Sequence, residues 1–166
     1  VNCAIILARI NSKRIKKKNI KNFCGKPIIY WTIQNIINSR RFDKIIVSTD
    51  DKTVARMSRK FGITVPFLRP KKLSTDKVGT KEVMSHAINY LEKNYSNLGY
   101  ICCFYATSIF SKPNLIKKSF SLLDKKTNYI FCAKKTNPQS FRSISLNKKN
   151  KIFIDNKKIN KRTQDL

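Results

Sequence analysis

The chain has 166 residues, enough for one domain with one hydrophobic core, and no apolar run approaches the about 20 residues that a membrane span requires. Its 36 basic and 9 acidic residues give a net charge of +27, which on its own favours a polyanionic ligand. The lysines are spread over every segment, however, so we interpret most of this charge as solvated surface and expect no specific binding to nucleic acid. A basic nucleic-acid-binding module is the alternative from another class of protein.

The five cysteines form no CxxC pair, and most of them lie in apolar, strand-like runs. This pattern favours reduced thiols over a disulfide framework or a zinc site. The start of the sequence also lacks the charged, apolar and small-residue layout of a signal peptide. We therefore expect a cytoplasmic protein that makes no membrane contact.

Strand-like apolar runs alternate with helical patterns along most of the chain. The expected strands cover residues 2–8, 43–49, 64–68, 100–105 and 128–133. The expected helices cover residues 27–39, 50–62, 80–94 and 111–124, the first beginning with Pro27 and the third capped by Thr80. This alternation predicts an α/β fold of three layers, with a mostly parallel sheet between helices and the wholly apolar run at 100–105 as a central strand.

The pattern changes near the end of the chain. Residues 142–146 and 151–154 alternate apolar and polar side chains around a polar turn, which predicts a β-hairpin. No repeat or Gly/Ser-rich linker interrupts the sequence. We therefore expect one domain over residues 1–166.

A polar loop that carries Arg9, Lys13, Arg14 and Lys18 follows the first expected strand. The end of a strand that enters a basic loop is where α/β folds bind phosphorylated ligands. Neither the GxxxxGK[ST] nor the GxGxxG motif is present, and a solvated lysine-rich loop is the alternative interpretation.

The run Leu7-Ala8-Arg9-x-Asn11-Ser12-Lys13, followed by Lys18-Asn19, resembles the nucleotide-binding signature of the CMP-N-acetylneuraminate synthetase family, the cytidylyltransferases that activate nine-carbon sugar acids. Many members have Gly-Gly at positions 10 and 11, and we expect Asn11 to preserve the tight turn because Asn tolerates positive φ. Later blocks at 47–51, 67–76 and 162–164 resemble further family segments, in the family's order. The resemblance implies a Rossmann-like sheet of the nucleotide-diphosphosugar transferase type.

The resemblance also implies a site for CTP, with Arg9, Lys13 and Lys18 as the catalytic residues. Its nucleotide-binding residues would be Leu7, Ala8, Arg9, Asn11, Ser12, Lys13, Lys18, Asn19, Arg69, Asp76 and Thr80. Within this set, Arg69 and Thr80 would read the cytosine, and the cations would hold the triphosphate.

The sugar acid is suggested by a departure from the sialate members of the family, which have Gln at the position of Tyr105. The run 105–107 and the final residues 162–166 look more like the members that activate pseudaminic acid. The sugar-binding residues implied by this resemblance are Tyr105, Thr107, Arg142, Arg162 and Gln164. CMP-sialate or legionaminate synthesis are the alternatives.

Members of the family use Mg²⁺, and their Asp-x-Asp metal site would lie downstream of Leu166. We therefore expect an incomplete chain, with residues 142–160 as the start of a dimerisation hairpin and a homodimer at full length. The adjacent Asp50 and Asp51 could hold a metal, but capping of the following helix is the favoured interpretation. The single histidine, His86, is interpreted as a packed side chain rather than a catalyst.

Overall fold

The computed structural model describes residues 1–12, 14–124, 126–127, 129–133, 144–146 and 152–154. Contacts divide the chain into two units, Val1–Asn128 and Tyr129–Leu166. The first unit contains the predicted α/β sheet, and the second contains the predicted hairpin of β6 (Ile144–Leu146) and β7 (Ile152–Ile154), which pair antiparallel. In the part of the chain that is described, no helix has both the length and the apolar character that crossing a membrane demands.

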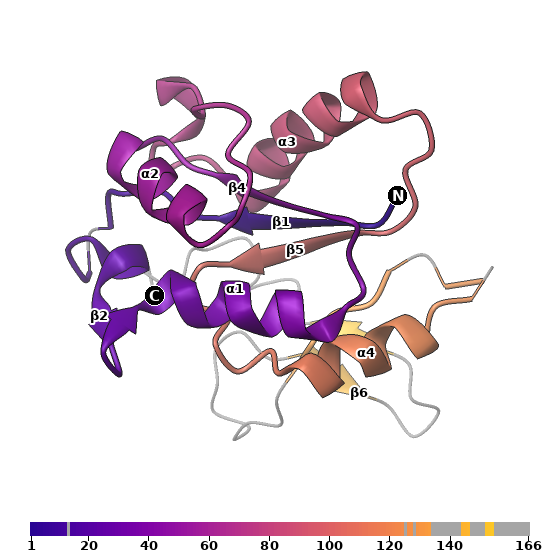
Figure 1. Ribbon diagram of the computed structural model, residues 1–166. Helices are drawn as coiled ribbons and strands as arrows, with labels where there is room; N and C mark the ends of the chain where they lie inside the picture. Colours follow the sequence, from indigo (N-terminus) through magenta and orange to yellow (C-terminus); the bar gives the residue numbers. More distant parts are fainter. Residues whose placement is uncertain (13, 125, 128, 134–143, 147–151, 155–166) are drawn as a thin grey trace. The chain divides into compact units, whose positions relative to one another are not determined.

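The sheet of the first unit has the order β4-β1-β5 among the described residues, and all its strands run parallel (Figure 1). The strands are β1 (Cys3–Leu7), β4 (Lys44–Ser48) and β5 (Ile101–Tyr105). Because Leu7 pairs with both Ser48 and Tyr105, all three strands end at the same level. Ligand sites of open parallel sheets lie at this carboxyl edge.

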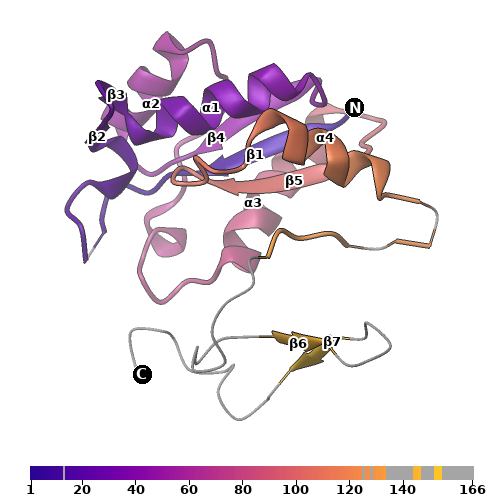
Figure 2. The ribbon, with the colours of Figure 1, turned by 90° about the horizontal axis from the view of Figure 1, so that it is seen from below.

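Four helices flank the sheet. They are α1 (Ile28–Ser39), α2 (Lys52–Lys60), α3 (Thr80–Asn94) and α4 (Pro113–Ser121). Two 3-10 turns, η1 (Lys18–Ile20) and η2 (Lys71–Leu73), and a small antiparallel pair, β2 (Asn22–Phe23) and β3 (Lys26–Pro27), complete the unit. Helices α1 and α3 lie on opposite faces of the sheet (Figure 2), which confirms the expected layers.

Strand β1 separates two hydrophobic cores because its side chains alternate between the faces of the sheet. Ala4 and Ile6 pack into the core that includes residues of α1, α2 and α4, whereas Cys3, Ile5 and Leu7 pack into the core beneath α3. All five residues of β1 are buried. The continuous apolar run read from the sequence is therefore a strand covered on both faces, at the centre of the described sheet.

Two predicted strands are wrong. Residues 64–68 make only two isolated parallel bridges, Ile46 with Thr64 and Thr49 with Leu68, because Pro66 has no N–H to continue a ladder. Residues 129–133 form no strand in the described part of the chain; Tyr129 and Phe131 stack with ring centroids 5.9 Å apart and remain exposed.

The position of β5 and some helix ends also differ from the prediction. Among the described residues β5 is an edge strand, and Tyr105 at its end is 52% exposed, so its apolar sequence did not indicate a central place. Pro27 precedes α1 as its N-cap, and Gly79, not Thr80, is the N-cap of α3. Helix α2 ends at Lys60, and Gly62 follows with a φ of 80°, a left-handed conformation that glycine adopts without strain.

Candidate nucleotide-binding site

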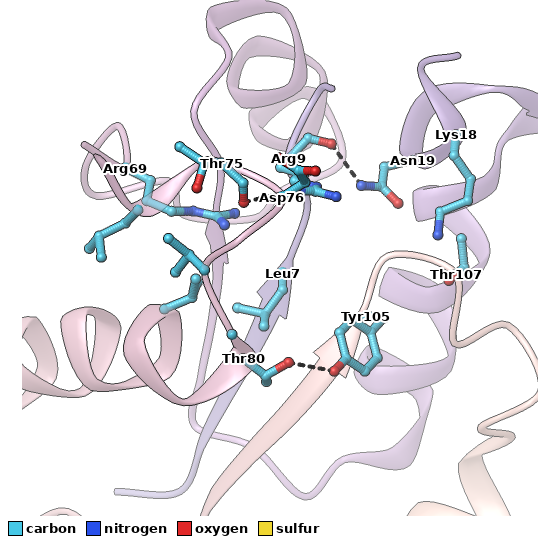
Figure 3. Close-up of a pocket in the computed structure, with 14 residues that line it drawn as sticks. Leu7, Arg9, Lys18, Asn19, Arg69, Thr75, Asp76, Thr80, Tyr105 and Thr107 are labelled. Atoms are coloured by element: carbon cyan, nitrogen blue, oxygen red, sulfur yellow. Dashed lines mark hydrogen bonds between the residues drawn. The ribbon is translucent and has the colours of Figure 1, made fainter. Parts of the chain in front are cut away.

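A cavity of about 230 Å³ opens at the carboxyl edge of the sheet, between the ends of β1 and β5 and the beginning of α3 (Figure 3). Most of the nucleotide- and sugar-binding residues predicted for the described part of the chain line it. These are Leu7, Arg9, Lys18, Asn19, Arg69, Asp76, Thr80, Tyr105 and Thr107. Side chains from four separate segments thus converge at one place.

A second cavity of about 580 Å³ shares Arg9, Thr75 and Asp76 with the first. The predicted residues Asn11 and Ser12 line this second space, together with Lys71. The basic loop after β1 therefore faces both cavities.

Sequence reasoning missed several lining residues, most of them in the segment between Arg69 and α3. Those of the first cavity are Leu73, Thr75, Val78, Gly79 and Val83, and those of the second include Asp50, Lys71 and Ser74. Val83 had a usable signal, because it follows Thr80 by three positions on a helix and so shares its face. The irregular segment 74–79 carries no periodic pattern from which its orientation could be read.

Arg9 lines both cavities and links the loop after β1 to the segment that precedes α3. Its Nη1 donates to the carbonyl oxygen of Thr75 at 2.8 Å, and its own carbonyl accepts from Nδ2 of Asn19 at 2.8 Å (Figure 3). Asn19 is 8% exposed, so this amide serves as a buried internal brace of the loop. A guanidinium has five N–H donors, more than this one bond uses.

The two adjacent aspartates have different partners. Oδ1 of Asp50 accepts from the backbone N–H of Ile10 at 2.9 Å, whereas Oδ1 of Asp51 accepts from the N–H groups of Thr53 and Val54 at 2.8 and 2.9 Å. Asp51 therefore caps α2, which confirms the capping interpretation. Among the described residues no group of three potential metal ligands occurs.

Arg69 is 6% exposed and is held beneath the first cavity. Its Nη2 donates to the carbonyl oxygen of Ser48 at 2.6 Å, and its backbone N–H donates to that of Thr49 at 2.7 Å. Burial lowers the pKa of the guanidinium, while the nearby Asp50 carboxylate opposes this shift. Its buried Nε has no hydrogen-bond partner among the described residues, so it is a donor that a bound ligand can satisfy.

Thr80 and Tyr105 approach each other across the rim of the first cavity (Figure 3). Their hydroxyl oxygens are 2.7 Å apart, and either can be the donor. This contact explains why Thr80 does not cap α3 as predicted, because its hydroxyl is directed toward β5 rather than back to the helix backbone.

Some predicted site residues are not brought to a cavity. Ala8 is fully buried, and its N–H continues the sheet by donating to the carbonyl oxygen of Ser48 at 3.0 Å. The expected positive φ at Asn11 is wrong: in the part of the chain with a described backbone, the loop instead takes a positive φ of 52° at Lys17. The predicted residues Lys13, Arg142, Arg162 and Gln164 lie outside the described residues.

His86 packs as predicted. Its ring meets that of Phe67 edge-on, with centroids 4.7 Å apart, and its Nδ1 is buried without a partner in the described chain. Burial, with smaller contributions from Arg69 and Lys72, lowers the pKa of the imidazole from its ordinary 6.5. The histidine belongs to the packing of α3 and does not line either cavity.

The geometry of a basic loop and a converging cavity at the sheet edge can be compared with known proteins. A family model described as cytidylyltransferase matches residues 3–165. The chain belongs to the cytidylyltransferase family. The chain is therefore an enzyme of the nucleotidyltransferase class. Residues of the loop signature line both cavities.

Curated relatives of this cytidylyltransferase include a pseudaminic acid cytidylyltransferase from Campylobacter jejuni strain 81-176, 35% identical over 99% of this chain and 72% of that protein. A bifunctional pseudaminic acid cytidylyltransferase and hydrolase from Helicobacter pylori is 36% identical over 98% of this chain and 31% of its own length. A CMP-N,N'-diacetyllegionaminic acid synthase from Legionella pneumophila is 34% identical over 72% of this chain and 51% of its own length.

Among solved structures, a CMP:2-keto-3-deoxy-manno-octonic acid synthetase complexed with CTP aligns with a TM-score of 0.60 at 16% identity, over 72% of this chain and 46% of that chain. A 4-diphosphocytidyl-2C-methyl-D-erythritol synthase from Anaerococcus prevotii aligns with a TM-score of 0.51 at 12% identity, over 92% of this chain and 63% of that chain. At these identities the likeness concerns the fold, which is that of the α/β nucleotidyltransferases.

Proposed function

We propose that the chain binds CTP across the two cavities and transfers CMP to the anomeric hydroxyl of a nine-carbon sugar acid. The observation that supports this most directly is the convergence of Arg9, Lys18, Arg69 and Thr80 on one cavity, since they come from three separate segments of a cytidylyltransferase. CMP transfer by a longer protein that contains this chain is part of the same proposal.

The base would occupy the first cavity and the triphosphate would extend along the loop after β1. Arg69 offers a buried Nε that has no partner in the described part of the chain, and Thr80 offers a hydroxyl at the start of α3. Lys18 lines the same cavity, and Arg9 and Ser12 line the second, so cations and a hydroxyl follow the path from base to phosphates. Lys13 belongs to this proposal through its place in the loop signature.

The reaction needs positioning and charge stabilisation more than covalent chemistry from the protein. The sugar hydroxyl oxygen forms a bond to the α-phosphorus of CTP while the bond from that phosphorus to the bridging oxygen breaks, and pyrophosphate leaves with the electron pair. The hydroxyl proton is lost to solvent or to a base. Arg9 and Lys18 would neutralise the negative charge that builds on the phosphate oxygens.

Pseudaminic acid is the sugar acid that we favour. Tyr105 stands where the sialate members have Gln, and a named pseudaminic acid cytidylyltransferase is 35% identical along 99% of the chain. Tyr105 and Thr107 both line the first cavity and would contact the sugar. The alternatives are sialic and legionaminic acid, because relatives with those named activities also match, at 36% identity over 52% of this chain for an N-acylneuraminate cytidylyltransferase of Escherichia coli.

Mg²⁺ is the expected cofactor of the family, and the described residues do not form a protein cage for it. The carboxylates at the cavities are Asp50 and Asp76, and one oxygen of Asp50 is used by the N–H of Ile10. Mg²⁺ commonly binds through one or two carboxylates together with substrate phosphates. No step of the proposed reaction is therefore assigned to the metal in this chain, and Mg²⁺ stays a prediction.

Two experiments test the proposal. Calorimetry with CTP, UTP, ATP and GTP should give clear binding only for CTP, and equal affinities would reduce the site to a general phosphate-binding loop. Pyrophosphate release with CTP, Mg²⁺ and pseudaminic, sialic or legionaminic acid then identifies the sugar. A duplex DNA complex that persists above about 200 mM salt would instead support the nucleic-acid-binding alternative.

A further inference from the structure

The hydrogen bond between Tyr105 and Thr80 connects two elements that meet at the first cavity (Figure 3). Tyr105 is the last residue of β5, and Thr80 is the first residue of α3. The Tyr105 side chain is 52% exposed, so burial does not fix the place of its hydroxyl. The 2.7 Å contact with Thr80 does.

The direction of this hydrogen bond follows from the acidity of the two hydroxyls. A tyrosine phenol has a pKa of about 10 in model peptides, far below that of an aliphatic alcohol, and is the stronger donor of the pair. With Tyr105 donating, the Thr80 oxygen accepts and keeps its own proton for another partner. Hydrogen bonds in series polarise each other in one direction, which strengthens Thr80 as a donor toward the cavity.

We infer that Tyr105 is a positioning residue for base selection: by donating to Thr80, it keeps the Thr80 hydroxyl as a donor toward a ring acceptor of the pyrimidine in the first cavity. This rests on the proposed function, because it requires CTP in that cavity. Cytosine has an unprotonated N3 that accepts a hydrogen bond, whereas uracil has an N3–H that donates. A hydroxyl held as a donor therefore favours cytosine.

Arg69 would not discriminate between the bases at O2, because a guanidinium carries only donors and both cytosine and uracil present an acceptor there. Arg69 is also fixed in place, with 6% exposure and a 2.6 Å bond to the Ser48 carbonyl. A donor at N3 does separate the two bases, and we assign that contact to Thr80, with Tyr105 behind it.

This assignment divides the use of the Tyr105 side chain. Its hydroxyl acts on the nucleotide side through Thr80, while its exposed ring stays available for the sugar acid, as the family resemblance implied. Removing only the hydroxyl should therefore change base selection, while the ring that would contact the sugar acid is retained.

The test measures the affinities of CTP and UTP by calorimetry for the wild-type chain, Tyr105→Phe, Thr80→Val, Thr80→Ser and the double variant Tyr105→Phe/Thr80→Val. We expect Tyr105→Phe to reduce the preference for CTP over UTP by about 3- to 10-fold, the range of one ordinary hydrogen bond. Thr80→Val should reduce it at least as much, Thr80→Ser should retain it, and the double variant should lose little more than Thr80→Val alone. Tyr100→Phe, at the residue just before β5 begins, is the matched control and should keep the wild-type ratio.

The outcomes separate this inference from the function on which it rests. A wild-type chain that binds CTP and UTP equally would overturn both. A wild-type chain that prefers CTP, with the same preference in Tyr105→Phe, would overturn only the role of Tyr105. Additive losses in the double variant would also overturn it, because two residues acting through one hydrogen bond cannot lose it twice.

Discussion

Asp50 accepts a hydrogen bond at 2.9 Å from the backbone N–H of Ile10, so the carboxylate that follows β4 anchors the loop that follows β1. The next residue, Asp51, is directed the other way and caps α2. Of the two adjacent carboxylates, Asp50 therefore supports the loop at the site and Asp51 supports a helix. Separate substitutions can measure the two contributions.

The first prediction concerns the anchor. Asp50→Ala leaves the part-buried Ile10 N–H without its acceptor, so we expect the free energy of unfolding to fall by about 1–3 kcal/mol and CTP to bind more weakly. Asp50→Asn retains an acceptor oxygen and should keep most of the stability. Urea unfolding and calorimetry measure the two effects. If Asp50→Ala bound CTP as the wild type does, the anchor would have no part in shaping the loop.

The second prediction concerns the cap. Asp51→Ala removes the acceptor for the N–H groups of Thr53 and Val54, and we expect a loss of about 0.5–2 kcal/mol in the free energy of unfolding. The affinity for CTP should stay at the wild-type value, because Asp51 lines neither cavity. A large fall in CTP affinity in the folded variant would show that Asp51 contributes to the site after all.

The third prediction concerns the cations. Lys18→Ala should weaken CTP binding by about 10- to 150-fold, since a hydrogen bond to a charged group contributes about 1.5–3 kcal/mol. Lys93→Ala, in the last turn of α3 and exposed, is the matched control and should change the affinity very little. Titrations at one fixed salt concentration compare them. Equal, small effects would mean that the cavity at Lys18 does not hold the phosphates.

The fourth prediction concerns pH. Burial lowers the pKa of folded His86 below 6.5, so between that lowered value and 6.5 the unfolded chain binds a proton that the folded chain does not. Stability that is fully present above this window is lost as the pH falls through it. We expect His86→Phe, which keeps a ring against Phe67, to lose less thermal stability than the wild type between about pH 7.5 and pH 5. If wild type and His86→Phe lost the same thermal stability over this pH range, the prediction would be wrong.

The sequence was most informative where one physical signal was sufficient. The uninterrupted apolar run at β1 requires burial on both faces, and the cationic loop that follows it has to lie at the carboxyl edge of the sheet. The grouping of Arg69 and Thr80 with this loop came from family resemblance, and the cavity confirms that these residues lie together. Their role in reading a base stays a proposal.

Other features depend on contacts between distant segments and leave no local pattern. The missing N–H of Pro66 matters only because residues 64–68 lie beside β4, which is distant in the sequence. The hydrogen bond between Thr80 and Tyr105 spans 25 positions. The hydrogen bond between Asp50 and Ile10 spans 40 positions. The sequence did not indicate it, because Asp50 and Asp51 were equally good candidates for the helix cap. Propensity and periodicity describe neighbours in sequence, so such pairs become visible only in the folded chain.

The two walls of the first cavity differ in how firmly they are built. One begins at β1, which is buried in both cores, and the other is the segment 71–79, which has a single 3-10 turn and is tied to the loop by the bond from Arg9 to the Thr75 carbonyl. Segments with few buried contacts open at the lowest free energy. The segment 71–79 should therefore determine the residence time of a bound nucleotide. Substitutions in it should change the dissociation rate of CTP rather than the preference for one base.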